Sequence, residues 1–123
     1  MFAMSSKFVV SLTRGLDDPD RATVAFVVAN AALGSDRDTV VFLSVEGVRL
    51  SQAGATDGVH EAGFAPLKDL MAQFAVGGGK ILVCSPCFKK RGLDEARLIP
   101  GAQVVGGARL VEFMADGAPS ISY

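Results

Sequence analysis

The sequence predicts an α/β fold in three layers, with helices on both faces of a mostly parallel sheet. Apolar, β-branched runs alternate with segments of helical periodicity in the order strand, helix, strand, helix, strand, helix, strand. The strand runs are apolar throughout, which is typical of strands buried on both faces. The chain has 123 residues, of which 50% are hydrophobic, so a single domain over residues 1–123 is expected. Right-handed crossovers between parallel neighbours then bring helices to both faces.

The first half of the chain is expected to supply two strands joined by a long helix. Residues 7–13 are an apolar run that predicts the first strand. Asp18 can cap a helix and Pro19 suits its first turn, so we predict a helix over residues 20–33, ending at a glycine. The apolar run at residues 39–45 predicts the second strand.

The second half is expected to continue the alternation after a loop. Residues 51–63 are poor in large apolar groups and rich in glycine, which predicts a long loop. Apolar residues at helical spacing predict a helix over residues 66–76, and the glycine run at 77–79 reads as its C-cap and a turn. A further helix is predicted over residues 103–115. Residues 118–123 follow as a terminal edge strand, because a proline stands near their start.

Both cysteines of the chain lie at the end of the third predicted strand. Residues 80–84 form an apolar run that ends at Cys84, and Ser85 and Pro86 then favour the start of a helix. The strand should therefore bring Cys84 to its carboxyl end, which is the edge where open α/β sheets bind ligands. Cys87 follows three residues later, so the two sulfurs can approach each other if a helical turn begins there.

The surroundings of these cysteines favour the thiolate form. Unpaired N–H groups at the start of a helix and the cations Lys89, Lys90 and Arg91 are all expected to lower the pKa of a nearby thiol. The alternative is that Cys84 is an ordinary core residue and the cations form a solvated turn, since cysteine is often buried. Burial alone does not explain two cysteines at a strand-to-helix junction followed by three cations, so we predict Cys84 and Cys87 as catalytic residues. We assign Ser85 and the three cations to binding.

Two further residues are candidates for the same site. Gly47 follows the second predicted strand, at another carboxyl end, and is assigned to substrate or partner binding. His60 is the only histidine and lies in the predicted loop, where it could shuttle protons to the thiol. The commoner reading of a single loop histidine is a solvated side chain.

Composition excludes several classes of function. A formal net charge of −1 argues against a general nucleic-acid-binding protein. No apolar run is long enough for a membrane span, and the N-terminus lacks the features of a signal peptide, so we expect the cytosol. Thiols stay reduced there, which favours redox or sulfur chemistry over a structural disulfide. Two cysteines and one histidine do not make a convincing zinc site, so we expect neither a metal nor a cofactor. The high apolar content favours a homo-oligomer.

The motifs resemble those of the DsrE/DsrF-like sulfur-relay family, which includes the TusD-like carriers. The resemblance runs through most of the chain. It rests on Gly47-Val48, on the glycine-ended helix before the third strand, on residues 80–87 followed by Arg91-Gly92-Leu93, and on the late helix around residues 110–113.

This resemblance implies a three-layer α/β fold and assembly into trimers or hexamers. It further implies that Cys84 accepts sulfane sulfur as a persulfide from a donor protein and passes it to an acceptor protein. No cofactor is required for such thiol exchange.

Two other classes of function stay open. The Cys-Ser-Pro-Cys segment is similar to the Cys-Gly-Pro-Cys motif of thioredoxins, so a dithiol oxidoreductase that uses Cys84 and Cys87 is possible on chemical grounds. Thioredoxins carry that motif after an early strand, whereas here it lies late in the chain. The other class is a non-catalytic oligomeric protein that binds a small ligand between the loop at residues 51–63 and the edge at Cys84.

Overall fold

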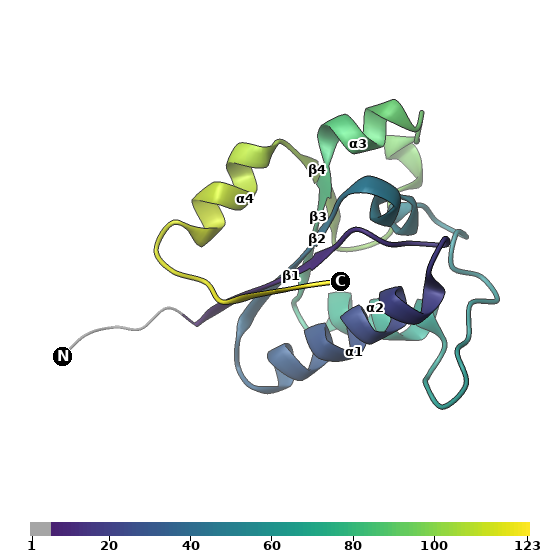
Figure 1. Ribbon diagram of the computed structural model, residues 1–123, viewed down its shortest axis with the longest axis horizontal. Helices are drawn as coiled ribbons and strands as arrows, with labels where there is room; N and C mark the ends of the chain where they lie inside the picture. The colour runs from purple at the N-terminus through teal and green to yellow at the C-terminus, as the bar shows by residue number, and fades with distance from the viewer. Residues whose placement is uncertain (1–5) are drawn as a thin grey trace.

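The computed structural model describes residues 6–123, which form one sheet of five parallel strands in the order β4-β3-β2-β1-β5 (Figure 1). The strands are β1 (Lys7–Leu12), β2 (Asp38–Leu43), β3 (Lys80–Cys84), β4 (Ala102–Val105) and β5 (Ser120–Ser122). The helices are α1 (Pro19–Gly34), α2 (Leu67–Val76), α3 (Ser85–Lys90) and α4 (Gly107–Met114), with 3-10 helices η1 (Val45–Ser51) and η2 (Glu95–Arg97). Residues 1–5 lie outside the described residues. They are part of the N-terminus for which we expected no signal peptide.

Helices cover both faces of the sheet, which confirms the predicted three-layer α/β fold. Helices α1 and α2 lie side by side on one face, and α4 lies on the other (Figure 1). On the first face the rings of Phe26 and Phe74 meet edge to face, with centroids 5.9 Å apart. On the second face Phe113 of α4 packs with Val9, Val40 and other strand residues. Within residues 6–123, every helix is too short or too polar to span a lipid bilayer.

Helix α1 begins at the predicted cap. The Asp18 side chain accepts a hydrogen bond from the backbone N–H of Arg21 at 3.1 Å. That bond, with help from the Arg21 guanidinium, lowers the pKa of Asp18 below its ordinary value. Because the folded pKa is the lower one, the carboxylate stabilises the fold at neutral pH, and this contribution is lost as the pH falls through the folded pKa.

We expect Asp18→Ala to lower the midpoint of chemical denaturation at neutral pH, because the N-terminal N–H groups of α1 lose their cap. The difference from the wild type should shrink in acid below the folded pKa of Asp18. Asp18→Asn is the control, since asparagine caps without charge. If Asp18→Asn lost as much stability as Asp18→Ala, the charge and not the cap would be responsible.

Two predicted boundaries near the site are wrong. The helix predicted over residues 103–115 begins only at Gly107, because Gln103 to Val105 extend as part of β4 and pair with Leu82 to Cys84. Gly106, in extended conformation, separates the strand from the helix. The second strand ends at Leu43, before the predicted end at residue 45, and the chain then turns into η1, which was not predicted.

Candidate functional site

The two cysteines lie at the carboxyl edge of the sheet, as predicted. Cys84 is the last residue of β3, and Cys87 lies in the first turn of α3. Helix α3 packs against η1, which follows β2, so two strand ends meet here (Figure 1). Ser85 was predicted to cap α3, which is wrong: Cys84 holds the cap position, and Ser85 is the first helical residue. The side chain at this cap position makes no capping hydrogen bond.

The two thiols are partly buried and form no disulfide, and each affects the pKa of the other. Burial raises the pKa of the Cys84 thiol above its ordinary value, and the neighbouring Cys87 sulfur adds to this effect. The backbone N–H of Cys87 and the charge of Arg91 act in the opposite direction but do not outweigh burial. The helix N–H group and the cation thus act on Cys84 as expected, but the net pKa is raised because burial, which was not foreseen, outweighs them.

Cys87 behaves in the opposite way, and here the expectation is confirmed. Burial acts to raise the pKa of Cys87, but the backbone N–H of Val45 and the Cys84 thiol act against burial. The charges of Arg91 and Lys90 add to them, and together they lower the pKa of Cys87 below the ordinary value of a thiol. Of the two thiols, Cys87 is therefore the one that loses its proton more readily.

Val45 has the backbone conformation that places this N–H. Its φ of 53° is in the left-handed region, which is uncommon for a β-branched residue, and its side chain is 48% exposed. The next residues are packed tightly against the loop after β1. A Cβ atom added to Gly47 would lie 2.4 Å from the carbonyl oxygen of Leu12, and one added to Gly15 would lie 2.5 Å from that of Glu46. Close backbone approach at these two glycines thus fixes the segment that carries the Val45 amide.

Arg91 joins α3 to η1 beside the thiols. Its side chain is 11% exposed, its Nη1 donates to the carbonyl oxygen of Cys87 at 3.2 Å, and its Nε lies 3.5 Å from Oε1 of Glu46. Within residues 6–123 this buried Nε has no hydrogen-bond partner, so its link to Glu46 is electrostatic. Glu46 also accepts a hydrogen bond from Nε of Arg49 at 2.6 Å. This bond and the charge of Arg91 together lower the pKa of Glu46 below its ordinary value.

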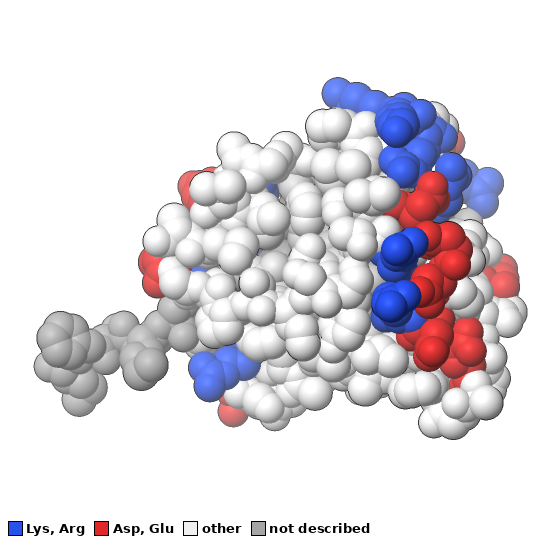
Figure 2. Space-filling view, in the orientation of Figure 1, with Lys and Arg blue, Asp and Glu red and all other residues white. Residues whose placement is uncertain are grey.

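Among the other predicted site residues, the two lysines are exposed and Gly47 is buried. Lys89 and Lys90 are exposed on α3, beside the thiols, where Figure 2 shows basic side chains gathered next to acidic ones. Gly47 lies at the same edge but is buried, and its role in the structure is the close packing described above.

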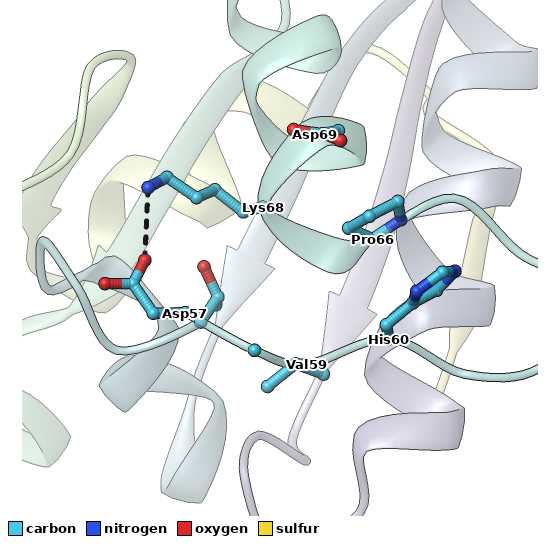
Figure 3. A pocket seen from close by; sticks show the side chains of 8 residues that line it. Asp57, Val59, His60, Pro66, Lys68 and Asp69 are labelled. Carbon is cyan, nitrogen blue, oxygen red and sulfur yellow. Dashed lines mark hydrogen bonds and ion pairs between the residues drawn. The ribbon is translucent and has the colours of Figure 1, made fainter.

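His60 is not brought to the thiols. Its Nε2 lies 2.7 Å from the carbonyl oxygen of Phe64, and because a carbonyl only accepts, Nε2 carries the proton. The ring lines a pocket between the loop and the start of α2, where Lys68 pairs with Asp57 at 3.1 Å (Figure 3). Neither cysteine lines this pocket.

Two contributors to the site were missed from the sequence. The Val45 amide is a backbone group, and a valine in the left-handed region has no sequence signature. Glu46 could have been found, since an acidic residue directly after a strand lies at the carboxyl edge. Residues 6–123 contain no group of three or more His, Cys, Asp or Glu side chains that could hold a metal ion.

Comparison with known proteins agrees with the fold. A model of the DsrE/DsrF-like family matches residues 6–123. The uncharacterized protein MJ0760 of Methanocaldococcus jannaschii is 28% identical over 107 residues, which are 87% of this chain and 38% of that protein, so the chain spans less than half of that relative. The crystal structure of the ychN protein from E. coli is similar with a TM-score of 0.76 and 15% identity, over 95% of this chain and 99% of that one. Protein MTH1491 of Methanobacterium thermoautotrophicum, a protein of unknown function, has a TM-score of 0.67 and 18% identity, over 95% and 98% of the two chains.

Proposed function

The chain belongs to the DsrE/DsrF-like family, and from this we propose that it relays sulfane sulfur, carried as a persulfide on Cys84 and passed to an acceptor protein. The family is associated with sulfur relay, and its relay members use a cysteine in the region of Cys84. The observation that carries the proposal is the position of Cys84 at the carboxyl end of β3, with a second thiol three residues later in the first turn of α3 that can take its proton. A lone buried thiol would lack such a base.

The uptake step is a thiol exchange. The Cys84 sulfur attacks the outer sulfur of a donor persulfide, R–S–SH, while its proton passes to the Cys87 sulfur. The bond between the two donor sulfurs breaks, the donor leaves as its thiol R–SH after taking back one proton, and Cys84 becomes Cys84–S–SH. Transfer to an acceptor thiol is the same reaction in the other direction. Oxidation states balance without a cofactor, because the sulfane sulfur only changes its partner.

Protein donors and acceptors need a surface to dock on. Lys89 and Lys90 are exposed next to the thiols (Figure 2), and such cations favour partners with an acidic surface. Assembly into a homo-oligomer stays a prediction. It is supported by solvent-exposed apolar side chains in both helical layers, because Val76 of α2 is 89% exposed and Val111 of α4 is 68% exposed.

Intact mass spectrometry tests the proposal. Wild type, Cys84→Ser and Cys87→Ser are each reduced, mixed with a low-molecular-weight persulfide and desalted. The intact mass of each protein is then measured. We expect Cys87→Ser to gain the mass of one sulfur atom, more slowly than the wild type because it lacks the Cys87 base, and Cys84→Ser to gain none. Wild type alkylated before mixing is the control and should gain no sulfur. Cys84 is not the carrier if a folded Cys84→Ser variant still gains sulfur. It is also not the carrier if all three proteins are folded and none of them gains sulfur.

The two free thiols three residues apart at the start of α3 also favour the dithiol oxidoreductase as a second candidate. That activity needs both cysteines and appears as a loss of two hydrogens on mild oxidation of the wild type. A protein that only binds a small ligand would tolerate either substitution.

A further inference from the structure

We propose that Cys87 gives the carrier a second activity, the release of its sulfur as sulfide, by attacking the Cys84 persulfide and closing a Cys84–Cys87 disulfide. This inference rests on the proposed persulfide. It concerns what happens to a loaded chain that meets no acceptor protein.

The positions of the two sulfurs permit this step. Cys84 caps α3 and Cys87 lies three residues later in its first turn, and the two thiols are close enough to affect each other's pKa. Neither is engaged in another disulfide. Residues three apart on a helical turn are neighbours, so the S–S bond needs no rearrangement of β3.

The surroundings make Cys87 the attacking sulfur. The Val45 N–H acts on its sulfur from η1, Arg91 at the C-cap of α3 donates to its carbonyl oxygen, and the charge of Lys90 also acts on it. Glu46 is the acidic group on this side, and it is already engaged by Arg49 and Arg91. These groups favour the thiolate form of Cys87, while Cys84 carries the sulfur to be attacked.

The reaction balances within one chain. The Cys87 thiolate attacks Sγ of Cys84–S–SH, the bond from Sγ to the outer sulfur breaks, and that sulfur leaves as HS⁻. The sulfane sulfur is reduced to sulfide, and the two cysteine sulfurs are oxidised to a disulfide. A single turnover therefore needs no outside reductant. A second turnover needs a dithiol reductant to reopen the disulfide.

A single-turnover experiment tests the inference. Reduced chain is loaded with a low-molecular-weight persulfide, desalted at once and incubated without reductant, and sulfide, protein-bound persulfide and remaining thiols are measured over time. We expect about one sulfide per wild-type chain, with the loss of both thiols. The rate per chain should not change on dilution, because the attack is intramolecular. Cys87→Ser should keep its persulfide and release at least tenfold less sulfide.

The outcomes separate this inference from the proposed function. If wild type and Cys87→Ser both hold a stable persulfide and release no sulfide, the inference is wrong and the carrier proposal stands. The inference is also wrong if the rate of sulfide release per chain rises with protein concentration, since the attack would then come from another chain. If no variant takes up sulfur, the carrier proposal itself fails.

Discussion

Replacing Gly47 with alanine is expected to lower the free energy of unfolding by about 1–3 kcal/mol, the usual range for overpacking. The new Cβ would lie 2.4 Å from the carbonyl oxygen of Leu12, and this neighbour is backbone at the end of a central strand. It cannot move aside as a flexible side chain could. We therefore expect η1 to shift away from β1, and the Val45 amide to shift with it.

Two measurements check this expectation. Chemical denaturation gives the loss of stability, and Gly34→Ala is the matched control, because nothing lies within 4 Å of the Cβ that it adds at the end of α1. Alkylation of Cys87 in a Cys84→Ser background should become slower at neutral pH, since the thiolate loses the Val45 hydrogen bond. Unchanged stability would show that the loop after β1 can yield. Unchanged alkylation would show that the Val45 amide does not govern Cys87.

The parts of the fold that depend on local chemistry were predictable from the sequence. Asp18 and Pro19 begin α1 in the structure because capping involves only the adjacent turn. Gly77 caps α2, and Gly78 has a φ of 92°, as the glycine run predicted. The apolar run ending at Cys84 became β3 because its length and β-branching suit a buried strand.

What was missed depends on contacts between distant segments. Strand β4 has four residues, and it is extended because Val104 and its neighbours pair with β3, whereas periodicity alone extends the next helix over them. The pKa of Cys84 was wrongly expected to be lowered, because burial by other segments cannot be read from the adjacent cations. The Val45 amide reaches Cys87 only through the packing of η1 on α3.

The largest electrostatic effect on the site is expected from Arg91→Met. This change removes the buried charge beside Cys87 and keeps most of the side-chain length. The pKa of Cys87 should rise, because less positive charge faces its thiolate. At a pH below that pKa, the thiolate fraction, and with it sulfide release, should fall roughly three- to tenfold.

The pH dependence of Cys87 alkylation distinguishes charge from packing. In a Cys84→Ser background the alkylation midpoint should move to higher pH in Arg91→Met, and both proteins should react equally fast well above it. Arg91→Lys should restore most of the shift, since it keeps the charge, and Arg109→Met on α4 should leave the midpoint where it is. Arg91 would act through its hydrogen bond to the Cys87 carbonyl if Arg91→Met were still alkylated more slowly at high pH. The same would follow if Arg91→Lys did not restore the alkylation midpoint. Arg91 would then position α3, and the thiolate would depend mainly on the Val45 amide.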